Sequence, residues 1–424
     1  MPLGVGVIGA GVVGGGVIRT LLSNAGVIRD KTGLEVVLRH VAEINQGNLK
    51  EFDLEGIRVS SDAKSLYDDP TVDVVCELIG GMEPAKSFIL GAMAAGKHVV
   101  TANKMLLAQA GAELTAAAQK HGVHLRYEAA VAGGIPIIKA LREGLAANHI
   151  RSIYAILNGT CNYILTRMTY EDLEFEAALK RAQELGFAET PPDLDVDGWD
   201  TAHKCQILAS LCYSTRVNLD DIFVEGVRNV THLDVAYARE MGYVIKLLAI
   251  IRRGDTEIEA RVHPTLVPEA MLLAQVRNEF NGIYVESDIA DATMYYGRGA
   301  GRMPTASAVV ADIIDIARAR ETPPPSPFRY THEIDIRDIG LLEGRYYLRM
   351  TTLDEPGVLG EICTILGKHR VGIASIIQKE EAEDTPAHIV ITTHTTIESS
   401  VMAALAEIDP LRFVTEPTHV MRML

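Results

Sequence analysis

An aspartate and a lysine stand one helical turn apart near the middle of the chain. Residues 187–204, FAETPPDLDVDGWDTAHK, are rich in acids and end on Asp200 and Lys204. Residues 199–212 contain no helix breaker, so they predict a helix, and at 100° per residue both charged side chains fall in line with its apolar stripe. A lone charge is costly to bury. A buried lysine beside carboxylates is therefore a candidate proton donor.

The alternative for this pair is an ordinary i, i+4 contact on a solvated helix face. Such contacts are common and contribute little to stability. Asp200 and Lys204 lie on the apolar side of the predicted helix, which is the wrong side for a solvated face. This favours the hypothesis that Lys204 is a proton donor. The identity of the substrate that would receive the proton must come from the rest of the chain.

A glycine-rich turn follows the first predicted strand, Gly4 to Ile8. Its spacing is GxGxxG, directly after a strand and before a predicted helix at 12–23. That context suits a tight turn, close approach of the backbone to a pyrophosphate, and phosphate at a helix N-terminus. Packing alone could also explain the glycines, but we favour dinucleotide binding. The candidate cofactor-binding residues of this turn are Gly9, Ala10, Gly11, Val12, Val13 and Gly14.

Two later strand ends add candidate cofactor contacts. Glu43 stands near the end of the predicted strand 35–44, where an acid would bind the ribose diol of NAD. An acid there favours NAD over NADP, although a shift of two residues in the alignment would remove the argument. Gly80 and Gly81 end the predicted strand 72–79 and allow a ligand close to the backbone.

Lys104 is a second candidate for chemistry. It opens a predicted helix directly after the strand 97–100, at the edge where doubly wound sheets bind ligands. A solvated lysine at a helix start is the plain alternative. A cation at a helix N-terminus opposes the helix dipole, however, which favours a functional role.

These residues require an α/β scaffold. Strand and helix patterns alternate up to about residue 130, which predicts a Rossmann-type doubly wound parallel sheet. Residues 231–296 mix short helices with β-rich runs, which indicates an α+β domain with a mixed sheet. The segment RETPPPSPFRY, residues 320–330, reads as a stiff linker. Residues after about 344 predict a ferredoxin-like βαββαβ unit.

Composition limits the class of protein. The 424 residues carry a formal charge of −16, which argues against nucleic acid and anionic membranes as partners. No run of 18 apolar residues is present, so no spanning helix is expected. The five scattered cysteines form no CxxC pair, which makes zinc and a disulfide framework poor hypotheses and favours the cytoplasm.

Six motifs in order resemble homoserine dehydrogenase. They are GAGVVG, TANK, YEAAVAGGIP, NGTCNYIL, the stretch at 187–204, and YYGRGAGRMPTASAVVADI. The resemblance covers residues 1 to about 320. One departure is Cys161, where the family more often has serine or threonine.

The resemblance implies reduction of L-aspartate 4-semialdehyde to L-homoserine with NADPH or NADH. It implies that Lys204 donates the proton, that Asp200 lies beside it, and that Lys104 lies near substrate and nicotinamide. The substrate's ammonium and aldehyde suit carboxylates and a lysine respectively. The remaining implied contacts are the substrate acids Glu189 and Asp195, the cofactor glycine Gly301, and a sodium site at Glu128, Val131, Gly133 and Ile135.

The C-terminal run DEPGVLGEI, residues 354–362, resembles the ACT domain, a regulatory module that binds amino acids. Plain turn chemistry is the alternative for Pro356 and Gly357. In this family setting threonine is the expected effector, and a homodimer or homotetramer is implied. No fused aspartate kinase is expected. The predicted domains are a nucleotide-binding domain at 1–130 plus about 303–320, a substrate domain at 131–302, a linker at 321–344, and the ACT domain at 345–424.

Two other functions stay open from sequence alone. One is a different amino-acid dehydrogenase with the same Rossmann and lysine apparatus. The other is a non-catalytic sensor whose ACT module does the work. A sensor would have no need to keep all five charged candidates, Lys104, Glu189, Asp195, Asp200 and Lys204, which favours an enzyme.

Overall fold

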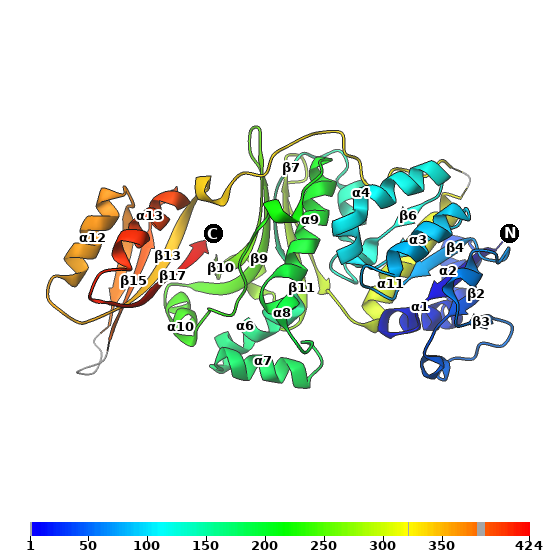
Figure 1. The fold of residues 1–424 in the computed structure, drawn as a ribbon, viewed down its shortest axis with the longest axis horizontal. Coiled ribbons are helices and arrows are strands. Elements are labelled where there is room, and N and C mark those ends of the chain that lie inside the picture. Colours follow the sequence, from blue (N-terminus) through cyan, green and yellow to red (C-terminus); the bar gives the residue numbers. More distant parts are fainter. Residues whose placement is uncertain (1, 321, 380–385) are drawn as a thin grey trace. The chain divides into compact units, whose positions relative to one another are not determined.

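The computed structural model describes residues 2–320, 322–379 and 386–424, so residue 321 of the predicted linker lies outside it (Figure 1). The described chain divides into two compact units. The first comprises residues 2–152, 203–219, 280–320 and 322–334, and the second comprises 153–202, 220–279, 335–379 and 386–424.

The first unit contains a six-stranded parallel sheet in the order β3-β2-β1-β4-β5-β6. This is the doubly wound order of dinucleotide-binding folds, so the predicted Rossmann-type sheet is confirmed. The strands are β1 (Leu3–Ile8), β2 (Val36–Ala42), β3 (Arg58–Ser60), β4 (Val74–Glu77), β5 (His98–Thr101) and β6 (Leu125–Arg126).

Helices cover the sheet because the crossovers from β1 to β2, from β4 to β5 and from β5 to β6 carry them, whereas the connections on either side of β3 carry only short 3₁₀ turns. Two of them, α1 (Val12–Ser23) and α11 (Arg302–Arg318), pack together and share one apolar core with β1, β2 and β4. The pair α3 (Ala85–Ala94) and α4 (Lys104–His121) packs together beside β4 to β6 (Figure 1). Thus α11, nearly 300 residues from α1, completes the N-terminal core.

The rest of the first unit departs from the predicted pattern in places. A helix α2 (Ala25–Thr32) follows α1. After the glycine pair of the YEAAVAGGIP motif the sequence predicts a helix at 135–147, and the helix that forms there is shorter. It consists of α5 (Ile137–Lys139) and a π-helical segment, Ala140–Gly144. The strands β11 (Phe280–Ser287) and β12 (Ala292–Arg298) form an antiparallel hairpin. The strand β7 (Ile150–Ile156) contributes residues to both units.

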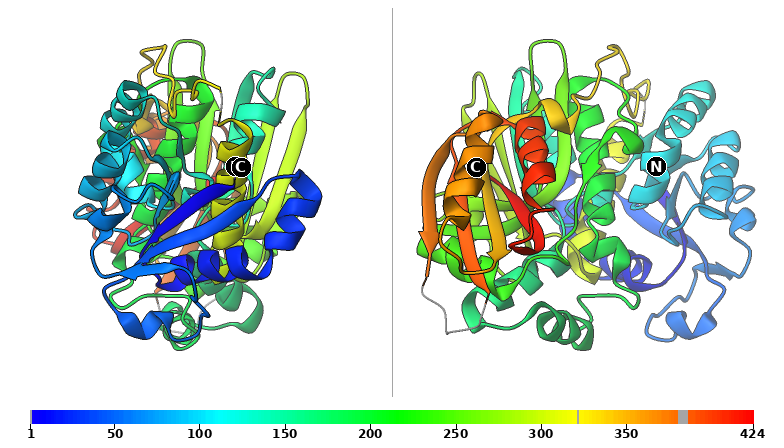
Figure 2. Two further views of the ribbon diagram at one scale, coloured as in Figure 1. Left: turned by 90° about the vertical axis from the view of Figure 1, so that its right-hand side faces the viewer. Right: turned by 60° about the vertical axis from the view of Figure 1, so that its left-hand side comes forward.

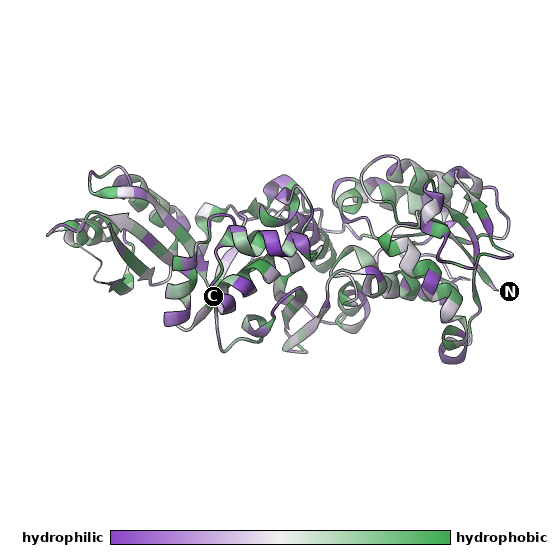
Figure 3. Cartoon of the chain, turned by 90° about the horizontal axis from the view of Figure 1, so that it is seen from below, coloured by the Kyte–Doolittle hydropathy of each residue, from purple (hydrophilic) through white to green (hydrophobic). Residues whose placement is uncertain are grey.

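The helices of the second unit's first part lie between β7 and β9 (Tyr243–Arg253) in the chain. These are α6 (Gly159–Glu171), α7 (Phe175–Glu184), α8 (Asp193–Val196), α9 (Trp199–Tyr213, whose residues after 202 belong to the first unit) and α10 (His232–Glu240). The coloured cartoon shows alternating apolar and polar bands along such helices, as expected when one face packs on a core (Figure 3).

The sheet of the second unit runs β9-β10-β17-β13-β15-β14, with short strands β8 on β10 and β16 on β13. Its first two strands pair antiparallel along their full length, whereas β17 joins β10 in parallel. The strands are β8 (Phe223–Val224), β9 (Tyr243–Arg253), β10 (Ile258–Pro268), β13 (Glu343–Thr352), β14 (Ile373–Gln378), β15 (Ala387–Thr393), β16 (Thr396–Ile397) and β17 (Val414–Met423).

The C-terminal part has the predicted βαββαβ order. Two helices, α12 (Val358–Lys368) and α13 (Glu398–Ile408), cover one face of β13 and β15 and share an apolar core with them (Figure 2). Among the described residues, no helix is both long and apolar enough to cross a membrane.

Candidate active site

The glycine turn after β1 leaves space only where a ligand would need it. Gly9 has a φ of +89°, and a Cβ on Gly14 would lie 1.8 Å from the Gly9 carbonyl oxygen, so both positions require glycine. A Cβ on Gly11 would meet nothing within 4 Å. The start of α1 is therefore open at Gly11, as a pyrophosphate at this helix N-terminus requires.

Gly15 and Gly16 are glycines for a different reason, the packing of a second helix. A Cβ on Gly15 would come within 2.6 Å of the Arg302 guanidinium, and one on Gly16 within 2.5 Å of the Arg302 carbonyl oxygen. These two glycines let α11 approach α1. Packing thus explains the end of the glycine run, while ligand approach explains its beginning.

Glu43 lies one residue beyond β2 and turns back onto the glycine turn. Its carboxylate accepts the Ala10 N–H at 2.5 Å and the Asn45 N–H at 2.7 Å. Burial alone would raise the pKa of Glu43, but these backbone donors hold it below its ordinary value. The acid is therefore charged at neutral pH and sits at the strand end where an adenosine ribose binds in this fold.

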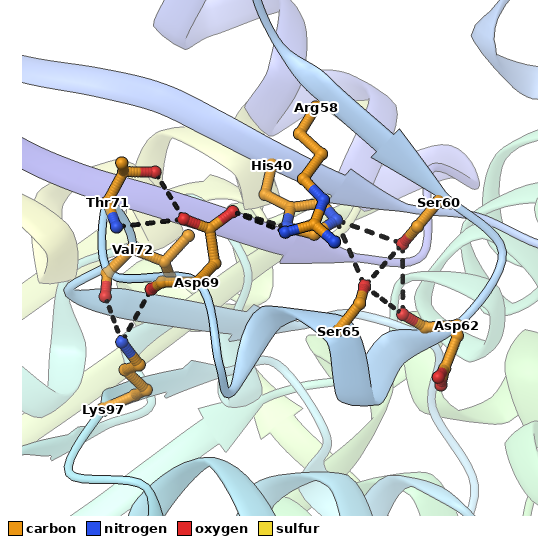
Figure 4. Close-up of polar contacts among 9 residues, drawn as sticks. All are labelled: His40, Arg58, Ser60, Asp62, Ser65, Asp69, Thr71, Val72 and Lys97. Atoms are coloured by element: carbon orange, nitrogen blue, oxygen red, sulfur yellow. Dashed lines mark hydrogen bonds and ion pairs between the residues drawn. The ribbon is translucent and has the colours of Figure 1, made fainter.

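A buried network supports the strand end that carries Glu43 (Figure 4). The Glu43 N–H donates to the Ser60 carbonyl, and the Ser60 hydroxyl lies 3.1 Å from His40 Nε2. On the other side of the ring, His40 Nδ1 lies 2.9 Å from Asp69. Burial lowers the pKa of His40, so the ring is neutral near pH 7.

This network has the residue types of a hydrolase triad but serves the fold. The hydroxyls of Ser60 and Ser65 both lie within hydrogen-bond distance of the Asp62 carbonyl, and Lys97 donates to the Asp69 and Val72 carbonyls. The contacts thus join β2, β3 and the loop before β4, which fixes the position of Glu43.

A second network organises the ends of β4 and β5. The buried Glu77 carboxylate accepts the N–H groups of Ile79 and Gly80 at 2.9 and 3.1 Å and the Thr101 hydroxyl at 2.7 Å. Asn103 caps α4 through the Leu106 N–H and donates to the Gly81 carbonyl. Lys104 follows as the first residue of α4. Gly80 and Lys104 therefore lie on one hydrogen-bonded edge of the sheet.

The segment with the predicted cation ligands is an irregular turn. Ala132 and Gly133 both have positive φ, at 55° and 50°. The Glu128 side chain accepts the N–H groups of Ile138 and Lys139, both at 2.8 Å, so it caps α5. Carbonyl oxygens in such a turn are the hard ligands that alkali cations prefer.

Two buried carboxyl groups meet at this turn. The Glu128 N–H donates to Asp312 at 2.7 Å. Burial raises the pKa of Glu128 to about 6, and burial together with the Glu128 charge raises the pKa of Asp312 to about 8. A cation bound at the turn would stabilise the ionised forms, so the residues present fit such a site.

The N-terminus of α6 contacts two of the predicted acids. Asn158 caps the helix by accepting the Cys161 N–H, and its amide nitrogen donates to Asp195 at 2.7 Å and to Asp200 at 2.8 Å. Thr160 donates to Asp195 at 3.2 Å. The Cys161 thiol donates to the Asp195 carbonyl, so this residue supplies a donor where a hydroxyl is more common.

Other acids of the same stretch have a different role. Arg228 forms ion pairs with Asp193 and Asp197 on the surface of the unit. Glu189 is exposed. Asp195 and Asp200, by contrast, share one donor, the amide of Asn158 at the N-cap of α6.

The α9 pair is buried, as predicted. Asp200 is 7% exposed and Lys204 9% exposed, so the alternative of a solvated helix face is wrong. The neighbours on the helix, Thr201 and His203, are buried as well. The pair therefore stays inside the protein rather than in bulk solvent.

Sequence inspection missed the residues that position these acids. Asn158 donates to two groups about 40 residues away in sequence, which no local pattern reveals. The first unit holds the nucleotide turn, Gly301 at the N-cap of α11, Lys104 and Lys204; the second holds Glu189, Asp195 and Asp200.

Comparison with known proteins gives matches over the whole chain. Family models described as homoserine dehydrogenase, NAD binding domain, as homoserine dehydrogenase, and as ACT domain match residues 9–128, 136–314 and 346–413. The homoserine dehydrogenase of Neisseria gonorrhoeae is 43% identical, covering 100% of this chain and 98% of that protein. That of Pseudomonas aeruginosa is 41% identical over 98% of this chain and 97% of its own.

Solved structures agree with the sequence comparison. A homoserine dehydrogenase from Thiobacillus denitrificans superposes with a TM-score of 0.94 at 42% identity, covering 100% of this chain and 98% of its own. A homoserine dehydrogenase from S. aureus superposes with a TM-score of 0.78 at 30% identity, covering 100% of this chain and 99% of its own.

Proposed function

The chain belongs to the homoserine dehydrogenase family, and from that premise we propose how its residues carry out the reaction. The enzyme is an oxidoreductase that interconverts L-aspartate 4-semialdehyde and L-homoserine. The full-length match disfavours the two alternatives, a different amino-acid dehydrogenase and a non-catalytic sensor. The burial of Asp200 and Lys204 on one helix face is the observation that carries the mechanism.

Lys204 acts as the proton donor to the aldehyde oxygen. The bound nicotinamide supplies the hydride, and the carbonyl oxygen gains negative charge as the hydride arrives. A buried ammonium stabilises that charge and passes its proton to form the alcohol; in reverse, the neutral amine accepts the proton. Asp200, one turn earlier on α9, favours the charged form of Lys204.

The substrate's amino-acid end needs the opposite charges. Asp195 and Glu189 bind the α-ammonium, and Lys104 binds near the reacting centre and the nicotinamide. The contacts of Asp195 with Asn158 and Thr160 support its role, because they hold one carboxylate in a fixed orientation.

Glu43 selects the cofactor. A charged acid at this strand end accepts hydrogen bonds from the adenosine ribose diol and repels a 2′-phosphate, so NAD is the preferred nicotinamide cofactor over NADP. The hydrogen bonds from Ala10 and Asn45, which keep Glu43 ionised, support this choice. The cofactor glycines are those of the turn after β1 together with Gly80 and Gly301.

A sodium ion binds at the turn formed by Glu128, Val131, Gly133 and Ile135, chiefly through backbone oxygens. The left-handed backbone of the turn and the nearby buried carboxyl groups support it. The role of the ion is to hold this turn in place, and the ion takes part in no chemical step.

Threonine is the proposed effector of the ACT module, and a homodimer or homotetramer the proposed assembly. The turn at Asp354, Val358 and Leu359 is the candidate contact. No disulfide joins the five cysteines, all of which lie among the described residues, and this fits a reducing compartment, the cytoplasm. Threonine titration of wild type and of the Asp354→Ala variant tests the effector: an unchanged rate at millimolar threonine in wild type contradicts it.

Substitution of Lys204 by alanine tests the mechanism. The turnover number should fall by about 10²–10⁴-fold, because no group replaces the proton donor, while the dissociation constant for NADH stays near that of wild type. Steady-state kinetics and cofactor fluorescence measure the two quantities. The exposed Lys50→Ala variant is the matched control. Near-normal turnover in Lys204→Ala would show that the donor is another residue.

A further inference from the structure

The amide of Asn158 lies between two carboxylates of the predicted site. Its nitrogen carries two hydrogens, and it donates to Asp195 Oδ1 at 2.7 Å and to Asp200 Oδ2 at 2.8 Å. These two acids come from different helices, α8 and α9. Both hydrogens of one amide are thus used to hold two acids at a fixed separation.

The orientation of this amide is determined by its other end. The Asn158 oxygen accepts the Cys161 N–H at 2.7 Å as the N-cap of α6. A flipped amide would place its oxygen against both carboxylates and its NH₂ against a backbone donor. The cap therefore aims the two N–H groups at the acids.

The helix that carries Asn158 is itself held in place. Gly159 allows close approach to the Glu279 carbonyl, which would lie 2.7 Å from a Cβ at that position. One turn later, the buried Lys246 donates to Asn162 at 3.0 Å and to the Val276 carbonyl. The position of the amide thus rests on contacts at both the first and the second turn of α6.

We propose that Asn158 is a positioning residue that sets the separation and the charged state of Asp195 and Asp200. The inference rests on the proposed roles of these acids in binding the substrate ammonium and in holding Lys204. A donor shared by two like charges offsets their mutual repulsion and favours the ionised form of each. Thr160, whose hydroxyl lies 3.2 Å from Asp195 and 2.5 Å from the Phe187 carbonyl, serves the substrate end.

The test separates this role from helix capping. Asn158→Ser and Asn158→Asp keep an oxygen that caps α6 but lack the amide donor. Each should lower kcat/KM by about 10- to 100-fold, and the acidic limb of the pH profile should move up by about 0.5–1 unit, because carboxylates that lose a donor have a higher pKa. Thr160→Val should raise KM with little change in kcat.

The control is Thr231→Ala, which removes the N-cap of α10 in the same unit. It should lower Tm without moving the pH profile. If both Asn158 variants keep the wild-type pH profile and lose activity only in proportion to the unfolded fraction, the positioning role is overturned. If Asp195→Asn and Asp200→Asn remain fully active, the proposed roles of the acids fail, and that result is distinguishable because it does not involve Asn158.

Discussion

Glu43 is the residue whose contacts bear most directly on cofactor choice. Replacing it with glutamine removes the negative charge while keeping its size. The ratio of kcat/KM for NAD to that for NADP should then fall by about tenfold, because repulsion of the 2′-phosphate is lost. Parallel assays with both cofactors measure the ratio.

The matched control for this variant is Glu55→Gln, an exposed acid of the same unit. Its cofactor ratio should equal that of wild type. A ratio that stays constant in Glu43→Gln would place cofactor selection elsewhere in the unit.

At the residue scale, the sequence revealed the chemistry of single positions better than their partners. The burial of Lys204 followed from helical periodicity, because the stripe that contains it is apolar. The contact of Asn158 with Asp195 and Asp200 did not, because three separate segments must fold before the amide meets the acids. Such long-range polar contacts leave no periodic signal.

At the scale of elements, the interaction of α11 with the turn before α5 gives a pH-dependent prediction. Asp312 in α11 accepts the Glu128 N–H, and its pKa is raised from 3.8 to about 8 by burial and by the Glu128 charge. An acid whose pKa is raised on folding binds more protons in the folded state. The stability that it contributes at low pH is therefore lost as pH rises from about 4 to about 8.

Asp312→Asn removes this ionisation and keeps an acceptor for the Glu128 N–H. In sodium-free buffer the variant should gain on the order of 1–3 kcal/mol relative to wild type between pH 5 and pH 8. Urea unfolding at both pH values gives the difference. Asp53→Asn, an exposed control, should show no such gain. A variant with the same pH dependence as wild type would contradict the prediction.

The same region contains a helix whose length the sequence does not predict correctly. The sequence predicts one helix at 135–147 after a glycine pair, but the structure has α5 followed by a π-helical segment. The Glu128 carboxylate caps Ile138 and Lys139 and so sets where the helix begins. Regular strands and helices of the nucleotide fold were predictable to within a few residues, since their periodicity is local.

At the scale of the whole molecule, the ACT segment and the strands β9 and β10 belong to one compact unit. The C-terminal strand β17 pairs in parallel with β10 at Thr265 and Leu266. Its residue Arg422 bonds Glu398 at the start of α13 and Glu225 beside β8. The last strand of the ACT fold, β17, thus shares a sheet with strands that precede it by more than 100 residues.

A buried ion pair makes the same connection. Asp234 in α10 is fully buried and accepts from Arg349 Nε at 2.6 Å and from the Tyr347 hydroxyl at 3.0 Å. Burial alone would raise the pKa of Asp234, but His419 and Arg349 hold it far below its ordinary value. Removing Arg349 leaves the Asp234 charge buried with weaker partners, the Tyr347 hydroxyl and His419.

These contacts predict that the C-terminal segment cannot be removed without damage. A chain that ends at residue 344 loses β17 from the edge of β10 and leaves Asp234 without Arg349. Its Tm should fall by about 10 °C or more, with loss of activity even without threonine, because an exposed strand edge and a lone buried charge are both destabilising. Threonine regulation must therefore be tested by substitution in the intact chain.

A double-mutant cycle on the ion pair isolates this connection. Arg349→Met alone should cost about 3–5 kcal/mol, since Asp234 remains charged in the interior. Adding Asp234→Asn should restore a large part of that loss, because the amide needs no counter-charge, and urea unfolding measures each corner of the cycle. If the two losses simply add, the pair does not couple α10 to β13. A truncated chain with wild-type Tm would show that the segment is independent despite the shared sheet.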